Sequence, residues 1–231
     1  MVKNMKIIVF APHPDDEIYG CGGSILKWME EGHDVHIVYV TDNRAFLWWG
    51  RKDNALIEEE AKDYINLTEN ELGEIGLQEA KEVAKAFGFP DKNIYLFKFH
   101  DQGASEKINE GIELSKSIIK DADRIVLPSD NNNHVDHQAT HTIVKETAKE
   151  LNLKDTEFYV YGIYNVLKAP KEKQIKIRII KYQEKIYELM KGYKTQLCLK
   201  DSRLGWQSFK FKRAERFAIF KLDDAGKFYN F

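Results

Sequence analysis

The sequence predicts an α/β protein in which a mostly parallel β-sheet lies between two layers of helices, a Rossmann-like three-layer sandwich. Apolar runs of strand length alternate with amphipathic stretches of helix length along much of the chain. The first strand, helix and strand fit within residues 6–40, which suits one right-handed βαβ unit. Clusters of histidine and aspartate stand directly after two of the apolar runs, and sheets of this kind bind ligands at the carboxyl ends of their strands.

The individual elements follow from the pattern in order. Residues 6–11 (KIIVFA) form an apolar run that suits a buried strand. Residues 24–31 carry an apolar stripe at helical spacing and stop at Gly32, a residue type that readily caps a helix. Residues 35–40 (VHIVYV) form the second strand. The alternation then predicts helices over residues 77–87, 109–120 and 137–151 and strands over residues 93–98, 124–128 and 157–162.

Two regions depart from this alternation. Residues 43–73 are long, charged and aromatic, and we expect them to form an insertion at the mouth of the sheet, in the position of an active-site lid. Residues 171–191 are rich in lysine and place Ile175, Ile179 and Ile186 at helical spacing. This second region predicts one amphipathic helix whose charges form a solvated face.

Composition narrows the class of protein. The chain has 231 residues, of which 43% are hydrophobic and 31% charged, and we expect one domain over residues 1–231 with a sizeable core. The formal net charge of −2 gives no strong field of one sign, so we expect no nucleic-acid partner. We find neither a signal peptide nor an apolar run of 18 residues, and therefore expect a cytoplasmic protein without a membrane span. Two cysteines are too few for a disulfide scaffold, and nothing in the sequence indicates the oligomeric state.

The motif APHPDDE occupies residues 11–17, directly after the first predicted strand. Three consecutive acids at this point can simply complement the positive end of the following helix. A histidine contributes little to that purpose, whereas imidazole nitrogen and carboxylate oxygen are both suitable ligands of Zn²⁺. His13 and Asp16 stand three positions apart in a strand-to-helix turn, which can aim both side chains at one point.

A second cluster, HVDH at residues 134–137, follows the strand predicted over residues 124–128. Two histidines three positions apart are weak evidence by themselves, because such pairs are often ordinary surface residues. Both clusters, however, lie at the carboxyl ends of strands of the same predicted sheet and would converge on one crevice. Three ligands with an open coordination position are typical of a catalytic zinc site.

These motifs give the chain its resemblance to a known family, the LmbE-like and PIG-L-like zinc N-deacetylases. APHPDDE, the glycine-containing turn YGCGG (residues 19–23) and the later HVDH carry most of the resemblance. The resemblance covers most of the chain and implies the LmbE-like deacetylase fold. It also implies a zinc-dependent hydrolase that removes acetyl groups, mostly from glucosamine-containing molecules. Weaker similarities are LQEAKEVAKAFGF (77–89), HDQG (100–103), GYKTQ (192–196) and AERF (214–217).

Matching positions imply roles for the residues of the two motifs. His13, Asp16 and His137 would hold one Zn²⁺ per chain, for which other divalent metals can substitute. Zinc polarises a carbonyl, and it lowers to about 7 the pKa of a water molecule bound to it. Asp15 would take a proton from that water as the general base.

The resemblance also implies roles for the remaining residues of the site. His134 would polarise the carbonyl or protonate the leaving amine, and Asp136, between the two histidines, would support them from behind. Gly76 stands where many relatives have an arginine that can hold substrate, which leaves the substrate contact open. The tryptophans of the insertion could stack on a sugar ring or equally pack within the insertion. Candidates for binding substrate are Arg44, Trp48, Trp49 and Asp101.

We therefore expect a metal-dependent hydrolase that removes the acetyl group from an N-acetylated amino sugar, small or part of a glycoconjugate. Two alternatives remain open, namely a zinc amidohydrolase acting on a non-sugar amide and a catalytically silent binding protein of the same fold. The coexistence of His13, Asp15, Asp16, His134 and His137 argues against a silent protein. A dinucleotide-binding protein is disfavoured, because GCGG (residues 20–23) lacks the GxGxxG spacing and the acids at the helix start would repel a pyrophosphate.

Overall fold

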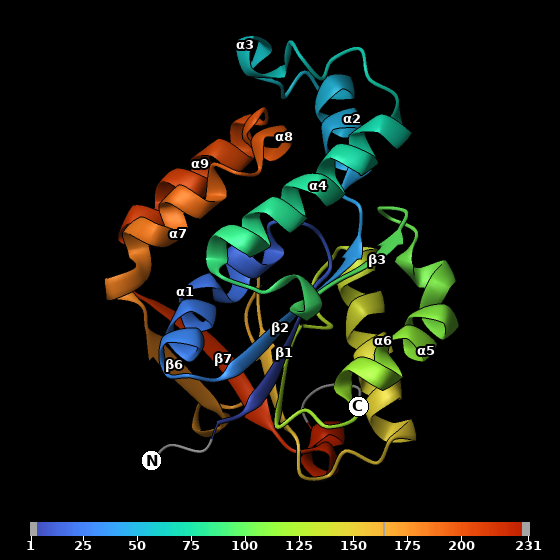
Figure 1. Ribbon diagram of the computed structural model, residues 1–231, viewed down its shortest axis with the longest axis vertical. Coiled ribbons are helices and arrows are strands. Elements are labelled where there is room, and N and C mark those ends of the chain that lie inside the picture. Colours follow the sequence, from blue (N-terminus) through green and yellow to red (C-terminus); the bar gives the residue numbers. More distant parts are fainter. Residues whose placement is uncertain (1–3, 164, 228–231) are drawn as a thin grey trace.

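The described residues are built around one central β-sheet. The computed structural model describes residues 4–163 and 165–227. Its strands are β1 (Lys6–Ala11), β2 (Asp34–Thr41), β3 (Ile94–Phe99), β4 (Arg124–Pro128), β5 (Glu157–Tyr161), β6 (Gln174–Arg178) and β7 (Ala214–Phe220). Within the described residues these strands form a seven-stranded sheet in the order β3-β2-β1-β4-β5-β7-β6, parallel from β3 to β5 and antiparallel at β7 (Figure 1). The predicted α/β fold with a mostly parallel sheet is confirmed.

Helices cover both faces of the sheet and create two hydrophobic cores. They are α1 (Asp16–Glu30), α2 (Arg44–Lys52), α3 (Glu58–Ala61), α4 (Glu69–Phe87), α5 (Ile108–Ile119), α6 (Val135–Glu150), α7 (Gln183–Met190), α8 (Lys194–Leu197) and α9 (Lys200–Ser208). α1, α4 and α7 lie on one face of the sheet, and α5 and α6 lie on the other (Figure 1). Successive residues of a strand face opposite sides, so Ile7 and Val9 of β1 enter the first core while Ile8 and Phe10 enter the second.

Helix α1 is bent shortly after the APHPDDE motif. It begins at Asp16, among the acids that the sequence places at the start of a helix, and Cys21 interrupts it with φ −151° and ψ 18°. The Glu215 carboxylate, from β7, accepts hydrogen bonds from the N–H groups of Gly23 (3.0 Å) and Ser24 (2.8 Å) just after the bend. A carboxylate from the far end of the chain therefore caps the second half of the helix that begins at the motif.

The prediction of one helix over residues 171–191 is wrong in its first half. β6 replaces it there and pairs with β7 in an antiparallel register that places Ile175 opposite Phe217. Ile175 and Ile177 turn toward the core between exposed basic residues, so the segment also satisfies the two-residue period of a strand. The edge of β7 supplies backbone hydrogen-bond partners that the local sequence cannot predict. This tertiary pairing outweighs the helical spacing of the isoleucines. Short 3-10 turns at Lys171–Lys173 and Ile180–Tyr182 flank β6.

Residues 43–73 are more helical than expected. α2 follows the end of β2 directly, and α4 begins within the segment, where Thr68 and Glu71 form a capping box. In Figure 1 this segment, with α2 and α3, forms the upper end of the molecule. Its action as a lid stays a prediction. The segment contributes to a small hydrophobic core of Leu47, Ala61, Leu72 and Cys198.

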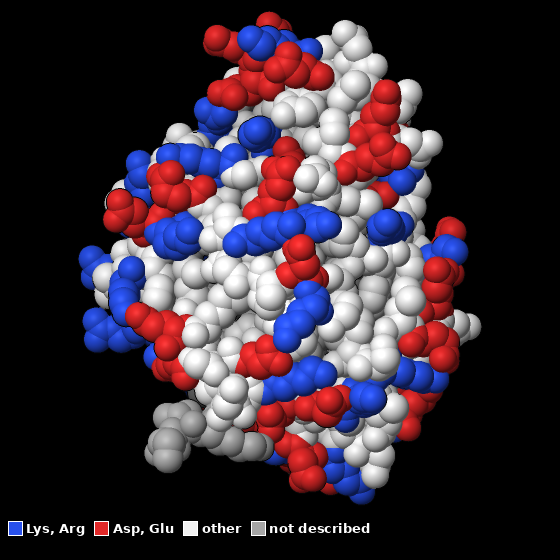
Figure 2. All heavy atoms as spheres, viewed as in Figure 1, with Lys and Arg blue, Asp and Glu red and all other residues white. Residues whose placement is uncertain are grey.

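The surface carries charges of both signs. Lys and Arg are mixed with Asp and Glu over the face seen in Figure 2, in keeping with the net charge of −2. Acidic side chains gather at the end formed by α3, which contributes Glu58, Glu59 and Glu60 (Figure 2). Among the residues that the structure describes, no helix is both long and apolar enough to cross a membrane.

Candidate active site

The structure brings the two sequence motifs together at the carboxyl ends of β1 and β4. His13 lies in the turn between β1 and α1, Asp16 is the first residue of α1, and His137 lies in the first turn of α6. One nitrogen of each histidine and one oxygen of Asp16 all lie within 4.8 Å of one another. Asp16 Oδ2 is 2.9 Å from His13 Nδ1 and 3.2 Å from His137 Nε2. The predicted convergence of two distant segments is therefore present.

The β1–α1 turn has an unusual backbone. Asp15 adopts a left-handed conformation with φ 109°, which residues other than glycine adopt at a cost. Its N–H donates to Glu17 Oε2 (3.1 Å), and the N–H of His13 donates to Asp16 Oδ2 (2.9 Å). From the end of β2, Asn43 Nδ2 donates to the Pro14 carbonyl (2.9 Å). These bonds hold the turn in a form that sends the side chains of Asp15 and Asp16 to different places.

The start of α6 fixes the second motif. His134 is the N-cap residue, and its Nδ1 accepts a hydrogen bond from the N–H of Asp136 (3.3 Å). Because Nδ1 is an acceptor, the neutral ring carries its proton on Nε2. The N–H of His134 in turn donates to Asn132 Oδ1 (2.8 Å). His137, in the first turn of the helix, is buried against Asp16.

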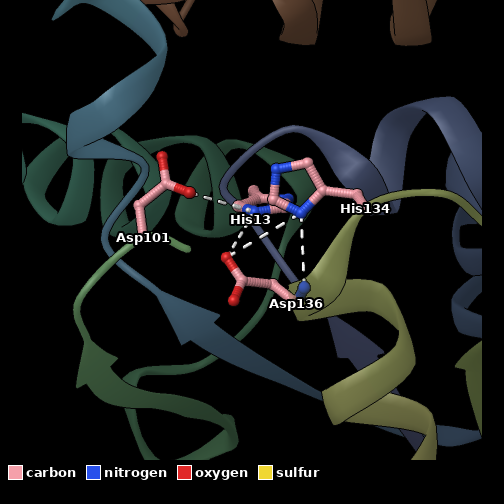
Figure 3. A group of neighbouring side chains, drawn as sticks. All are labelled: His13, Asp101, His134 and Asp136. Atoms are coloured by element: carbon pink, nitrogen blue, oxygen red, sulfur yellow. Dashed lines mark hydrogen bonds and ion pairs between the residues drawn. The ribbon is translucent and has the colours of Figure 1, made fainter. Parts of the chain in front are cut away.

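Two buried carboxylates orient His13 from behind (Figure 3). His13 Nε2 lies 3.1 Å from Asp136 Oδ2 and 3.3 Å from Asp101 Oδ1. A metal-binding histidine usually donates its other ring N–H to a carboxylate, which fixes the ring and its tautomer. With Nε2 facing these carboxylates, Nδ1 is left facing Asp16 and His137. Asp136 is itself held by the N–H groups of Gln102 (2.6 Å) and Ala104 (3.0 Å).

The electrostatics of the site favour a cation. Burial opposes a charge on His13, but the hydrogen bond and charge of Asp101, together with Asp136 and Asp16, raise the pKa of His13 well above its usual value. Burial likewise opposes a charge on Asp16, but His137 and His13 lower the pKa of that carboxyl far below its usual value. Burial and the charges of Asp16 and Glu17 raise the pKa of Asp15.

The residues present fit a divalent metal ion. Asp15, Asp16, Asp101 and Asp136 are buried, and among the described residues none of these four is ion-paired with lysine or arginine. Buried charges of this kind are normally paired or bind metal. Ligand atoms that share one zinc ion at 2.0–2.1 Å lie roughly 3.3 Å apart, close to the two distances around Asp16 Oδ2. Nitrogen and oxygen donors suit Zn²⁺ and several other divalent ions.

A cavity of about 250 Å³ opens onto this cluster. His13, Asp15, Asp16, His134 and His137 all line it. Apart from Asp101, the other polar lining residues received no role from the sequence. Those include Asn43, Asn132 and Gln196, of which the first two follow predicted strands and could have been found by position alone.

The candidates for binding substrate fall into three groups. Trp49 lines the cavity, and Asp101 lines it while keeping both carboxylate oxygens in hydrogen bonds or ion pairs. Trp48 lines a neighbouring groove instead. Arg44 lines neither hollow, because its guanidinium pairs with Asp42 Oδ2 (2.7 Å). Its binding of substrate stays a prediction without support from this geometry.

The structure explains why residue 76 is glycine, at the position where the resemblance led us to expect an arginine. A Cβ atom at this position would lie 2.4 Å from the carbonyl oxygen of Asp42, so the helix can approach the end of β2 only with glycine here. Arg44 and Asp42 also pack against Gly73 on the same helix. A side chain at Gly76 would therefore displace the start of α2.

The fold and the cluster define a class: mostly parallel α/β proteins that present two histidines and an aspartate at the carboxyl ends of the sheet. The sequence model of the PIG-L family, described as GlcNAc-PI de-N-acetylase, matches residues 8–148. The chain belongs to this family, as its motifs predict. A stretch of 36 residues is also 39% identical to a glucosamine-6-phosphate deaminase-like protein of Bacteroides thetaiotaomicron, but it spans 16% of this chain and only 5% of that protein.

Solved structures share the fold over nearly the whole chain. The N,N′-diacetylchitobiose deacetylase from Pyrococcus horikoshii superposes with a TM-score of 0.72 at 20% identity, covering 95% of this chain and 85% of that one. The zinc-inhibited form of the teicoplanin deacetylase Orf2 gives 0.67 at 13% identity, covering 95% and 99%. GalB, the 4-carboxy-2-hydroxymuconate hydratase from Pseudomonas putida KT2440, gives 0.61 at 12% identity, covering 93% and 95%. Because deacetylases and a hydratase share this fold, the reaction has to be argued from the site.

Proposed function

We propose that this chain is a divalent-metal-dependent N-deacetylase that hydrolyses the acetamido group of an amino sugar or its conjugate. One observation carries the proposal: Asp16 Oδ2 lies within 3.2 Å of both His13 Nδ1 and His137 Nε2, beside a cavity that Asp15 and His134 also line. Membership of the PIG-L family supports de-N-acetylation as the reaction. The deacetylases among the structural neighbours support an acetylated sugar as the class of substrate.

The metal and its ligands set the starting point of the reaction. His13, Asp16 and His137 would hold the ion, with Zn²⁺ the first candidate for this donor set. A divalent ion held there would polarise the acetyl carbonyl and make an attacking water more acidic. The remaining steps are proton transfers and charge stabilisation, and these fall to side chains of the cavity wall.

Two side chains would move and stabilise charge. Asp15 accepts a proton from the water while the water oxygen attacks the carbonyl carbon. Asp15 then returns that proton to the amine nitrogen as the C–N bond breaks. Acetate and a free amine are the products. His134 presents its Nε2 proton and would donate a hydrogen bond to the carbonyl oxygen as that oxygen gains charge. Asp136 holds His134 and His13 in these orientations.

The test combines metal analysis with a substrate screen. Purified protein is analysed for metal, dialysed against a chelator and assayed for acetate release before and after Zn²⁺, Ni²⁺ or Co²⁺ is added back. One panel holds N-acetylglucosamine and its glycosides, and the other holds N-acetyl amino acids. We expect about one ion per chain, loss of turnover on chelation, recovery on addition, and acetate from the sugar panel.

Other outcomes would favour the alternatives. Full turnover by metal-free protein would contradict the proposal. Acetate from the amino-acid panel alone would identify an amidohydrolase of non-sugar amides. An occupied metal site without turnover on either panel would favour a binding protein.

A further inference from the structure

A second hollow adjoins the candidate site. This open groove of about 440 Å³ runs along α2 and the loop after β3. Trp49, Asp101 and Gln102 line both the groove and the cavity of the site. The two hollows therefore lie next to each other and share one wall.

Two tryptophans form one side of the groove. Trp48 and Trp49 both line it and leave 37% and 39% of their surfaces exposed. Their rings meet edge to face, with centroids 5.0 Å apart and planes at 87°. Lys52 Nζ lies 5.4 Å and 4.8 Å from the two ring centroids and adds cation–π attraction to both. These contacts fix the rings before any ligand arrives.

The helix that carries the tryptophans is firmly held on its other side. The N–H of Ala45 donates to Asp101 Oδ2 (3.0 Å), and Leu47 is buried in the small core between α2 and α4. Arg51 donates to the carbonyl of Leu67 (3.0 Å). The exposure of the two rings is therefore a property of a fixed platform and does not come from a loosely packed helix.

The rim of the groove mixes hydrogen-bonding groups of both signs. Glu69, Glu106 and Gln102 line it together with His100 and Lys107. The Lys107 ammonium is already paired with a carboxylate outside the groove, 2.9 Å away, so the remaining charge is mainly acidic. Such a rim repels phosphate and other anions but offers acceptors and donors to hydroxyl groups. A sugar ring has an apolar C–H face for the tryptophans and hydroxyls for the rim.

We propose that the groove binds a neutral sugar ring linked to the acetylated residue, so that the preferred substrate is an amino-sugar disaccharide or a longer glycan. The proposal rests on the N-deacetylase function and deepens it. Asp101 aligns the two parts, because Oδ1 contacts His13 Nε2 (3.3 Å) while Oδ2 holds the start of the tryptophan-bearing helix. Trp49 stands at the junction, and Trp48 belongs to the groove alone.

The kinetic test compares one ring with two. kcat/KM is measured for N-acetylglucosamine and N,N′-diacetylchitobiose with the metal-loaded wild type, Trp48→Ala and Trp206→Ala. We expect the wild type to prefer the disaccharide at least tenfold, and Trp48→Ala to lower this preference about tenfold, mainly through KM, as the loss of one ring contact predicts. Trp206, stacked on Tyr187 far along the chain in α9, is the control and should leave the preference unchanged. The preference is a ratio, so any loss of folded enzyme cancels.

A binding measurement separates this inference from the proposed function. Calorimetric titration of N,N′-diacetylchitobiose into wild type and Trp48→Ala needs no turnover. Tighter binding to the wild type without acetate release would support the groove and contradict the deacetylase. Hydrolysis of both sugars with equal kcat/KM, unchanged in Trp48→Ala, would contradict the groove and leave the deacetylase standing. Two results would contradict a sugar ring in the groove. One is failure of the disaccharide to bind, and the other is a preference for an octyl glycoside of N-acetylglucosamine over the disaccharide.

Discussion

Asp15 and Asp16 are chemically identical neighbours whose surroundings differ. Asp16 Oδ2 faces His13 and His137, whereas Asp15, turned aside by its left-handed backbone, contributes to the cavity wall. We predict that Asp16→Asn weakens metal binding more than tenfold and loses turnover with it. Asp15→Asn should keep its metal and lower kcat by a factor of about 10² to 10⁴, because an amide cannot accept the proton.

Metal stoichiometry and kcat are measured on the two Asn variants side by side. Each serves as the control for the other, since both substitutions preserve size and remove one charge. A metal-free Asp15→Asn beside a loaded Asp16→Asn would reverse the two roles. If both variants keep metal and turnover, the acids only complement the start of α1.

Glu79 gives the stability of the fold a pH dependence. This buried carboxylate of α4 accepts hydrogen bonds from the Thr195 N–H (3.1 Å) and hydroxyl (2.6 Å) at the start of α8. Burial outweighs these bonds and raises the pKa of Glu79 from 4.5 to about 7. Between these two pH values the folded state holds more protons than the unfolded state, so the free energy of unfolding falls as pH rises and levels off above about 7.

Glu79→Gln should remove this dependence. We expect the variant to gain stability relative to wild type as pH rises from 5 to 8, by an amount on the order of 2–3 kcal/mol, because the amide stays neutral. Urea unfolding at a series of pH values measures the difference, and taking the difference cancels other titrating groups. Parallel curves for the two proteins would show that Glu79 is ionised normally in the fold.

At the scale of elements, the bend in α1 depends on one carboxylate. Glu215 is 2% exposed and satisfies the N–H groups of Gly23 and Ser24 where Cys21 breaks the helix. Glu215→Ala would leave these buried donors without a partner, and we predict a loss of about 2–4 kcal/mol in the free energy of unfolding. Metal affinity should fall as well, because Asp16 begins the same helix.

The matched control is an exposed glutamate. Glu188 forms a surface ion pair with Lys191, and Glu188→Ala should cost less than about 0.5 kcal/mol. Urea unfolding and a metal titration are run on both variants. Equal stability of the Glu215 and Glu188 variants would mean that the bend is held by packing instead.

The elements that the sequence predicted well are those whose pattern is local. Apolar runs such as residues 6–11 are buried on both faces of a parallel sheet, and no other placement suits them. β6 was missed because its isoleucines fit two periods at once and the edge of β7 decides between them. The start of α4 was missed because polar capping at Thr68 extends the helix beyond its apolar stripe.

At the scale of the whole molecule, topology accounts for how much of the site could be foreseen. Parallel strands put the residues after β1 and after β4 at one edge, so the convergence of the two motifs followed from their places in the chain. Asp101 contacts both His13 and the N–H of Ala45, and Gln196 lines the cavity. Both placements depend on how the loop after β3 and helix α8 pack, and the spacing of residues in the sequence does not predict this packing. The orientation of His13 by Asp136 was expected only as support for the histidines.

A bound ion would link two segments that are more than 100 residues apart, and this gives a test at the scale of the molecule. Since the unfolded chain does not bring His13, Asp16 and His137 together, Zn²⁺ should stabilise the folded state by about 4 kcal/mol at a thousand times its dissociation constant. We predict that added Zn²⁺ raises the unfolding midpoint of metal-free wild type and of His141→Asn, whose ring lies one turn further along α6 and bonds to the Pro128 carbonyl. His137→Ala should lose the shift.

An equal shift in His137→Ala would place the ion instead among His13, Asp101, His134 and Asp136, the second group of donors that the fold brings within 4.8 Å. Thermal unfolding of the three proteins with and without Zn²⁺ therefore decides which ring nitrogen of His13 binds the metal.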